Sequence, residues 1–424
     1  MRLVALAVVA GCLLWSRPLQ AFVLSEDELE DRSTELGLML RSFSFVLAGP
    51  VLRPPYNPLG DADPNGLGLF DLRATFSHKS PWLKLVLHNQ LTARVSSHAS
   101  VGVLALGRGQ EPRRWLPLEA DLAGPDGGFG LRESVDWAFA ELTLGPLTLA
   151  AGRQPITFGR GKLWKPMDLI STFSLTEVDT EYKPGVDALR LDWTVQPQTN
   201  LILVAAAGRF NDDLLTGSTL ALRAKQGLPR GEVGFLGGFV RRDVVLGADA
   251  VVDAGKFDLY TELVLHVLTD DSLSPRQPDT ARTVLRALLG ATFKPTSKLT
   301  LSPELYFNGF GDWQADDYLR VALSDRMAMG EMYNMGRAYL GGLALWEAHP
   351  LLNLSAGLIF NPVDPSGLLS MGLNYSLAAN IVLVAGGYIP AGRLPDLRAP
   401  VLPEPRSEFG LYPYFVYVEL KAAM

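Results

Sequence analysis

The chain has 424 residues, a formal net charge of −7 and a single cysteine. This charge, without any block of Lys and Arg, argues against nucleic acid as a partner, and one cysteine excludes a disulfide within the chain. Glycine (41 residues) and proline (29 residues) are frequent, and beyond the first residues no apolar run is long enough for a membrane-spanning helix. This composition leaves two classes, a large soluble β protein and an outer-membrane β-barrel.

The chain begins with the pattern of a secretory signal. A basic start precedes an apolar run from Leu3 to Trp15, and a polar stretch then ends at the small residue Ala21. The run is shorter than the roughly 20 apolar residues of a spanning helix, so we predict that residues 1–21 are a cleaved signal peptide. Cys12 closes a Val-Ala-Gly-Cys sequence that resembles a lipoprotein cleavage box, and lipidation of Cys12 stays open as the alternative.

Alternation of apolar and polar residues is the main structural signal in the rest of the chain. In residues 82–96 the odd positions are apolar, apart from Asn89, and the even positions are polar, apart from Trp82 and Val86. Residues 256–268 and 298–309 alternate in the same way. A period of two is typical of β-strands with one apolar face, although a soluble antiparallel sheet shows it as well.

The connections between the candidate strands distinguish the two classes. About 18 candidate strands are joined by connections that are short and long in turn, with Gly145-Pro146 among the short ones. The connection at Arg241-Arg242 is short where a long one is due. Transmembrane barrels alternate tight periplasmic turns with longer external loops in this way. The long connections lie near residues 48–66, 97–133, 154–184, 209–216, 269–281, 310–333, 361–367 and 389–408.

We therefore predict an all-β fold, a transmembrane antiparallel β-barrel of about 18 strands, with 16 as the alternative count. In lipid every backbone donor and acceptor must be paired within the protein, which strands achieve only by closing into a barrel. Residues 22–35, which are rich in acidic side chains, are predicted to be a periplasmic lead-in, and residues 36–424 the barrel. A soluble β-sandwich or propeller is the alternative fold.

The stretch from residue 147 to residue 193 departs from the strand pattern. Two strand-like segments, 147–153 and 186–195, are separated by about 30 irregular residues. Ordered loops of this length are usually functional, so we predict a loop that folds into the barrel and narrows it. Trp164 within it is interpreted as a packing residue, with stacking on a sugar ring as the alternative. The charged residues predicted at the constriction are Arg153, Arg160, Lys162, Lys165, Asp168, Glu177, Asp179 and Glu181.

Charged residues on the polar faces of the strands are expected to line the lumen. Both signs are well represented, so two interpretations stay open: a transverse field that orients solutes, and a cross-strand network that pairs the wall charges. The balance of charges does not decide between anions and cations. The predicted lumen-wall residues are Arg73, Lys84, Arg94, Arg190, Asp192, Asp258, Glu262, Arg282, Arg286, Glu304 and Arg337.

The sequence resembles porin-like outer-membrane barrels, of which alginate-export and phosphate-selective porins are examples. The resemblance rests on the strand end Gly152-Arg153-Gln154, followed by Phe158-Gly159 and Pro166-Met167-Asp168, together with the alternating strands. It implies a pore of 16 or 18 strands with an inward loop. The end of the chain, Leu420 to Met424, departs from the terminal aromatic residue that the assembly machinery of such barrels usually recognises.

No catalytic, cofactor or metal site is expected. The five histidines lack metal-ligand spacing, and the hydrolase and zinc-protease motifs are absent. We predict a channel for passive diffusion of small polar or charged solutes, in contact with outer-membrane lipid, lipopolysaccharide and the barrel-assembly machinery. A homo-oligomer stays open. The alternative functions are a plugged structural or adhesive barrel and, third, an outer-membrane hydrolase.

Overall fold

The computed structural model describes residues 22–27, 31–52, 56, 64–96, 114–124, 128–171, 182–210, 213–269, 282–396 and 404–423. The predicted signal peptide therefore lies outside the described residues. Three residues of the predicted constriction, Glu177, Asp179 and Glu181, also lie outside them.

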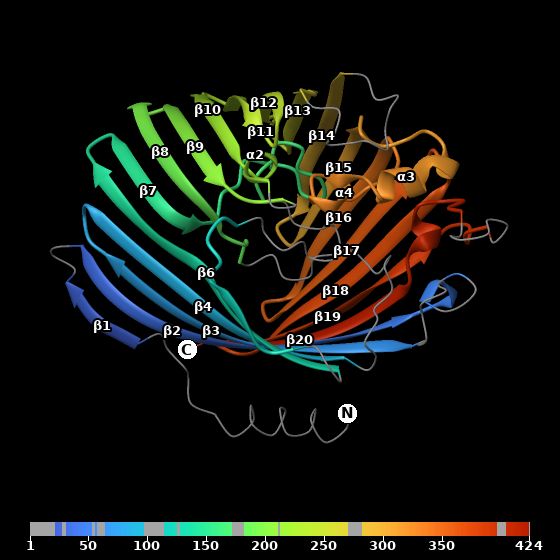
Figure 1. Ribbon diagram of the computed structural model, residues 1–424, viewed down its shortest axis with the longest axis horizontal. Helices are drawn as coiled ribbons and strands as arrows, with labels where there is room; N and C mark the ends of the chain where they lie inside the picture. Colours follow the sequence, from blue (N-terminus) through green and yellow to red (C-terminus); the bar gives the residue numbers. More distant parts are fainter. Residues whose placement is uncertain are drawn as a thin grey trace.

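Eighteen antiparallel strands close into a barrel, as the sequence pattern predicts (Figure 1). Each strand pairs with its neighbours along the chain, and the last strand returns to pair with β2. The barrel strands are β2 (Arg32–Ala48), β3 (Asn65–Lys79), β4 (Leu83–Ser96), β6 (Phe129–Leu144), β7 (Leu147–Gln154), β8 (Val186–Gln196), β9 (Thr199–Ala207), β10 (Thr219–Leu228), β11 (Gly231–Val240), β12 (Asp243–Asp253), β13 (Phe257–Val267), β14 (Thr283–Thr296), β15 (Leu299–Asn308), β16 (Ala338–His349), β17 (Leu352–Asn361), β18 (Ser366–Ala378), β19 (Ile381–Ala391) and β20 (Tyr414–Ala423).

Two further strands cover edges that the barrel ladder leaves open. β1 (Phe22–Asp27) pairs with the first residues of β2, beyond the point where β20 ends. β5 (Glu119–Ala123) pairs with residues 131–134 of β6, beyond the point where β7 ends. Covered edges offer no template to other chains. Part of the segment expected as a periplasmic lead-in, residues 22–27 and 32–35, is thus strand.

Short and long connections lie at opposite ends of the barrel. β6 and β7 are joined by two residues at the short end, whereas β15 and β16 are joined by residues 309–337 at the long end. The described helical segments all belong to long connections; they are η1 (Pro50–Leu52), α2 (Leu214–Gly217), η4 (Ala315–Asp317), α3 (Tyr318–Ala322), α4 (Asp325–Ala328) and η5 (Phe409–Leu411). Within the described part of the chain, no helix has the length and apolar character needed to cross a membrane.

The two faces of the wall differ in polarity. In β13 the side chains of Tyr260, Glu262, Val264 and His266 are buried inside, and the residues between them point outward. Outward residues elsewhere are apolar, and Leu189, Phe235, Leu289 and Val416 each expose more than half of their surface. A closed wall with an apolar outer face is what a bilayer requires.

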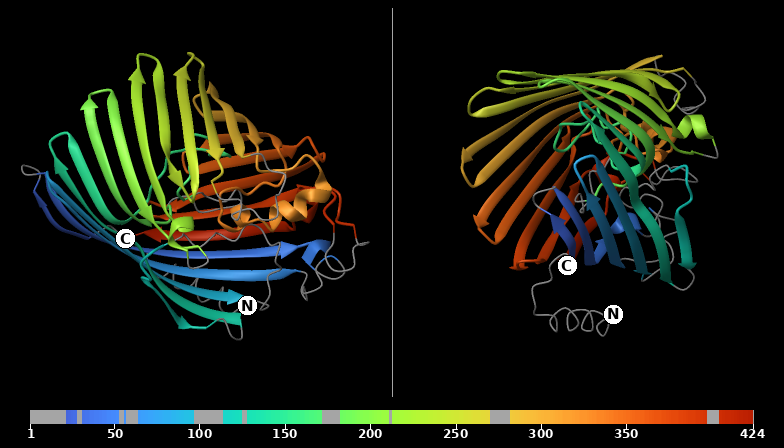
Figure 2. Two further views of the ribbon diagram at one scale, coloured as in Figure 1. Left: turned by 45° about the horizontal axis from the view of Figure 1, so that its top comes forward. Right: turned by 90° about the vertical axis from the view of Figure 1, so that its left-hand side faces the viewer.

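The chain between β7 and β8 runs into the barrel interior (Figure 2). We call its described residues, 155–171 and 182–185, the inward segment. Ile156, Phe158, Met167 and Ile170 are buried in a cluster with wall residues of β8 to β13. Apolar contact therefore holds the inward segment against one side of the wall, as the long irregular stretch predicts.

Candidate functional site: the narrowed barrel interior

Two carboxylates of the wall hold the backbone of the inward segment. Glu262, on β13, accepts hydrogen bonds from the N–H groups of Gly161 and Met167, both at 2.8 Å, and from that of Arg160. Glu304, on β15, accepts from the N–H groups of Lys162, Leu163 and Trp164 at 2.5, 2.9 and 3.2 Å. The segment between residues 160 and 167 is thus wrapped around two anions.

This arrangement explains why two acidic residues are tolerated inside the barrel. Glu262 and Glu304 are 0% and 2% exposed, and a buried carboxylate is costly unless several donors satisfy it. Consecutive backbone N–H groups form such a nest, and bonds to a charged acceptor are stronger than neutral ones. Gly161 is required in the nest, because a Cβ there would lie 1.7 Å from the carbonyl oxygen of Trp164.

Side chains add a second layer of anchoring. Arg160 forms ion pairs with Asp249 and Glu232 on β12 and β11. Arg223, on β10, pairs with Asp249 at 2.8 Å and donates to the carbonyl oxygen of Phe158 at 2.6 Å. These acidic wall residues are engaged by the segment and by neighbouring arginines, so they do not form a free acidic wall.

Trp164 packs in the way that its interpretation as a packing residue predicts. Its ring stacks on Tyr306 with centroids 5.3 Å apart and lies 5.9 Å from Tyr339. Gly341, on β16, leaves room for it, since a Cβ there would be 2.5 Å from the indole. With 5% of its surface exposed, Trp164 offers no free face to a sugar ring.

Asp168 and Lys183 join the two described parts of the inward segment. The ammonium of Lys183 donates to both carboxylate oxygens of Asp168, at 2.6 and 2.7 Å, and to the hydroxyl of Thr157. Burial raises the pKa of Asp168, against the opposing effect of Lys183, and burial likewise lowers the pKa of Lys183. The pair joins the two parts of the segment rather than presenting charge to the barrel interior.

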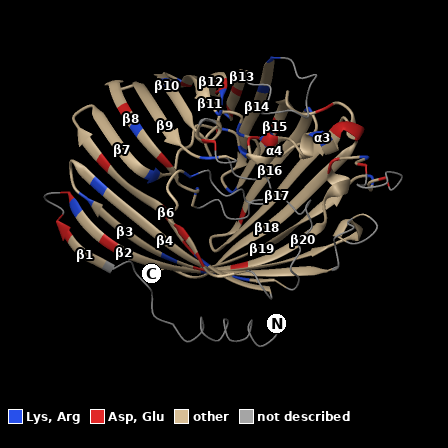
Figure 3. Ribbon diagram, in the orientation of Figure 1, with Lys and Arg blue, Asp and Glu red and all other residues tan. Residues whose placement is uncertain are grey.

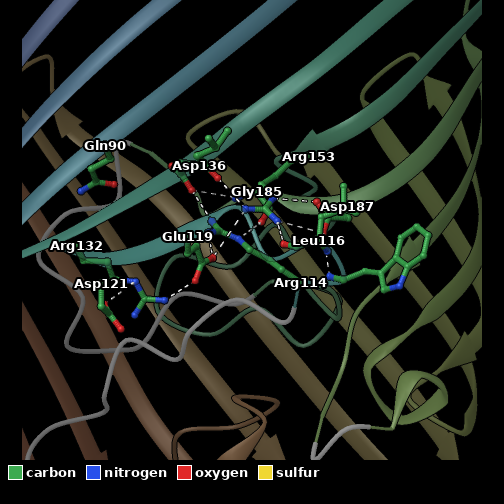
Figure 4. Close-up of polar contacts among 12 residues, drawn as sticks. Gln90, Arg114, Leu116, Glu119, Asp121, Arg132, Asp136, Arg153, Gly185 and Asp187 are labelled. Atoms are coloured by element: carbon green, nitrogen blue, oxygen red, sulfur yellow. Dashed lines mark hydrogen bonds and ion pairs between the residues drawn. The ribbon is translucent and has the colours of Figure 1, made fainter. Parts of the chain in front are cut away.

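The roots of the inward segment meet a cluster of ion pairs (Figure 4). Arg153, at the end of β7, is fully buried; its guanidinium pairs with Asp187 of β8 at 2.9 Å and donates to the carbonyl oxygens of Val135 and Leu116. Arg114, in the connection before β5, bridges the carbonyl oxygen of Gly185 and the carboxylates of Asp136 and Glu119, the latter two at 2.8 and 2.6 Å.

This cluster buries Arg153, so that it presents no charge to the open interior of the barrel. Its side chain has 0% exposed surface, and the external segment that carries Arg114 lies over it. Asp187 also accepts the backbone N–H groups of Trp115 and Leu116. Arg153 therefore fixes the point at which the chain leaves the wall, and its predicted role at the constriction has no contact to support it.

The described constriction residues differ in what they present to the lumen. Lys162 is exposed, while Lys165 and Arg160 are half-buried and Asp168 is buried. The backbone N–H of Lys162 donates to Glu304, so the side chain with its ammonium extends from a fixed backbone position. Among the constriction residues that the structure describes, Lys162 is the one that projects an exposed charge.

The predicted wall residues near β3 to β8 are mostly paired across strands. Arg73 points inward, with Asp136 at 2.9 Å and Gln90 at 3.0 Å. Arg190 pairs with Asp192 at 2.8 Å and with Glu141 at 3.2 Å. Three predicted wall residues, Lys84, Arg94 and Asp258, lie exposed near strand ends. These contacts support the interpretation as a cross-strand network more than a free transverse field.

Three of the predicted wall arginines occupy other settings. Arg286, on β14, is buried and donates to the hydroxyl of Tyr306 at 3.1 Å. Arg337 precedes β16 and donates to the carbonyl oxygen of Gly311 at 2.7 Å. Arg282 is exposed in the connection before β14. Arg282 and Arg337 thus belong to connections, because the strands begin one residue later than the alternation suggests.

Charged residues are unevenly distributed around the barrel. Figure 3 shows them along β2 to β8 and around the inward segment beside β11 to β15. The four strands β16 to β19 contain one charged residue, Glu347. The interior beside the inward segment therefore has a charged side and a neutral side.

Sequence reasoning singled out Arg153 but missed the residues grouped around it at the roots of the inward segment, which are Arg114, Glu119, Asp136 and Asp187. Asp136 leaves one signal in the sequence, a break in the alternation of β6. The break arises because a register shift opposite His88 lets Asp136 and Trp137 both point inward. Arg114 and Glu119 carried no pattern that distinguishes them from other residues of a long loop. In the described part of the chain, no three His, Cys, Asp or Glu side chains are grouped so as to hold a metal ion.

Solved outer-membrane porins share this fold. A BenF-like porin from Pseudomonas fluorescens Pf-5 is similar with a TM-score of 0.55 at 10% identity, over 92% of this chain and 98% of that one. OccAB1 from Acinetobacter baumannii matches with a TM-score of 0.54 at 9% identity, over 96% and 99%. OpdK from Pseudomonas aeruginosa, in a structure with vanillate, matches with a TM-score of 0.50 at 13% identity, over 92% and 98%.

These likenesses extend over almost the whole of both chains, and at such identities they show the fold. The porin-like barrel predicted from the sequence is confirmed, whereas the narrower comparison with alginate-export and phosphate-selective porins gains no support from these matches. No protein-family model and no curated protein matches the sequence significantly.

Proposed function

We propose that this chain is a porin-like channel of the outer membrane, through which small polar or charged solutes diffuse passively past the inward segment. The observation that carries the proposal is the inward segment itself, bound to Glu262 and Glu304 inside a closed barrel with an apolar exterior. A fixed obstruction within a wall suited to lipid is how pores select by width and charge.

Small organic anions are the first solutes to test. OpdK, which shares the fold, has been solved with vanillate, an aromatic carboxylate. In this chain the exposed Lys162 on the inward segment supplies a positive charge that such a carboxylate would meet. The neutral strands β16 to β19 would face the uncharged part of the solute.

Single-channel recording tests the proposal. The refolded protein in a planar bilayer should give discrete, reproducible current steps, and the reversal potential under an asymmetric salt gradient should reveal the ion preference. Added vanillate should interrupt the current if it enters the constriction. A silent bilayer from folded, heat-modifiable protein would reject the channel and favour a plugged barrel whose external connections carry the function.

A further inference from the structure

The connection between β15 and β16 also contacts the inward segment. We call these residues, 309–337, the strap; they contain η4, α3 and α4, which lie at the long-connection end beside β14 to β16 (Figure 1). The strap contacts the inward segment directly at Trp164, and Arg241, in the turn between β11 and β12, links it to Ile170. These two ties are additional to the wall carboxylates described above.

The first tie runs through a single amide. The indole Nε1–H of Trp164 donates to Oδ1 of Asn334 at 2.8 Å, and Nδ2 of Asn334 donates to Oε1 of Glu408 at 3.0 Å. An indole only donates and a carboxylate only accepts, so the orientation of the amide is determined by its two partners. All three residues are buried, and a buried indole N–H that lost its acceptor would carry a desolvation penalty.

Glu408 is itself held by neutral donors from three parts of the chain. Its carboxylate accepts from the backbone N–H of Met335 at 3.1 Å, from Nδ2 of Asn361 at 3.2 Å and from the hydroxyl of Tyr339. Burial raises the pKa of Glu408, against these hydrogen bonds, which favour the charged form. The strap is therefore fastened beside β17 and β20 as well as to Trp164.

The second tie is ionic. Arg241 pairs with Glu331 of the strap at 3.0 Å and donates to the carbonyl oxygen of Ile170 at 3.4 Å. Arg326 of the strap pairs with the same Glu331 at 2.7 Å and with Asp243 at 2.8 Å. Burial alone would raise the pKa of Glu331, but Arg326 and Arg241 outweigh it and hold that pKa at about 2.

The turn at this tie carries two arginines in a backbone conformation that strains any residue other than glycine or asparagine. Arg241 and Arg242 have φ angles of 51° and 73°, in the left-handed region that asparagine and glycine normally occupy in two-residue hairpins. Such conformations cost free energy and persist where the surroundings determine them. Here the turn directs Arg241 inward, to the strap and the inward segment.

We propose that the strap positions the inward segment, so that an external connection and the barrel wall together set the width of the constriction. Asn334 is the positioning residue, because it holds the ring of Trp164 while Glu262 and Glu304 hold the neighbouring backbone. This inference rests on the proposed function, in which the inward segment is the selective element. It follows that breaking the buried contacts of the strap, outside the inward segment itself, alters conductance.

A double-mutant cycle tests the tie. Trp164→Phe keeps a ring on Tyr306 but removes the N–H, and Asn334→Leu removes the acceptor. Each variant should change the single-channel conductance, and the double variant should change it no more than the larger single effect, because both remove the same bond. Trp313→Phe is the matched control, since Trp313 lies on the same strap with 51% of its surface exposed.

An exchange of partners adds a rescue. Asn334→Asp places a carboxylate against Glu408, and Glu408→Gln places an amide against Asn334, so each alone should disturb the constriction. Together they restore a donor opposite an acceptor and should recover part of the wild-type conductance. Additive effects in the first cycle, or wild-type conductance in all these variants, would overturn the positioning role while the channel itself stood.

A second readout does not require a conducting pore. In a Cys12→Ser background, Lys162→Cys reports the freedom of the inward segment through its labelling rate with a water-soluble maleimide. Adding Asn334→Leu should raise that rate about fivefold, the change in population that loss of one hydrogen bond permits. An unchanged rate would reject the positioning role even in a silent barrel, whereas silence of the wild-type protein alone would reject only the channel.

Discussion

The root and the tip of the inward segment are held by different chemistry. At the root, Arg153 and Asp187 form a buried pair of side chains, with Arg114 beside them. At the tip, Glu262 and Glu304 bind backbone N–H groups. The root therefore depends on the side chains of the residues at which the segment begins and ends. At the tip the wall carboxylates hold the backbone directly, and Arg160 and Trp164 add side-chain contacts.

The largest expected effect comes from breaking the tip. In the wild type the backbone N–H groups face carboxylate oxygens. In the double variant Glu262→Gln, Glu304→Gln each amide replaces one of these acceptor oxygens by an NH2 donor, which costs on the order of 2–4 kcal/mol for each residue. The segment should leave the wall, and single-channel conductance should rise. Asp258→Asn, on the same strand as Glu262 but exposed, is the control; an unchanged conductance in the double variant would show that the carboxylates do not hold the segment.

Breaking the root should affect stability more than conductance. Arg153→Met leaves Asp187 buried without its cation, which typically costs about 3–5 kcal/mol. The midpoint of heat modification on electrophoresis should fall accordingly. Asp187→Leu added to Arg153→Met should recover part of the loss, and a midpoint equal to that of the wild type in Arg153→Met would contradict the structural role.

The smallest expected effect is a response of the strap to acid. The folded pKa of Glu331, about 2, lies below the ordinary value of 4.5, so its ion pairs stabilise the fold above pH 4.5 and are lost as the pH falls toward 2. The contribution amounts to about 3 kcal/mol. The difference in heat-modification midpoint between the wild type and Glu331→Gln should be full at pH 6 and vanish near pH 2.

The wall could be predicted from the sequence because its signal is local. Each strand repeats an apolar residue at every second position, and the lengths of the connections alternate between the two ends. The inward segment could be predicted because about 30 residues between two strands exceed any turn. Both inferences require only neighbouring residues.

The anchors of the inward segment could not be predicted in the same way. The sequence predicts that Glu262 and Glu304 lie on the lumen wall. Their partners, however, are backbone N–H groups about 95 to 142 residues away. Every residue except proline has such a group, so no residue type in the sequence identifies the partners. Asn334 lies 170 residues from Trp164 along the chain, and Glu408 lies a further 74 residues on. Charged residues that are predicted to face the lumen can therefore instead bind other parts of the chain, and the spacing of residues in the sequence does not show which of them do so.

The seam of the barrel has a consequence for its biogenesis. β2 and β20, near opposite ends of the chain, pair along ten residues from Met39 opposite Ala423 to Ala48 opposite Tyr414. Because these two partners are so far apart in the sequence, the barrel cannot close before the whole polypeptide up to β20 is present. Until then two long strand edges remain open, and topologies of this kind form slowly and are exposed to aggregation. The barrel of this chain can thus be closed only once its last strand is available to pair with β2.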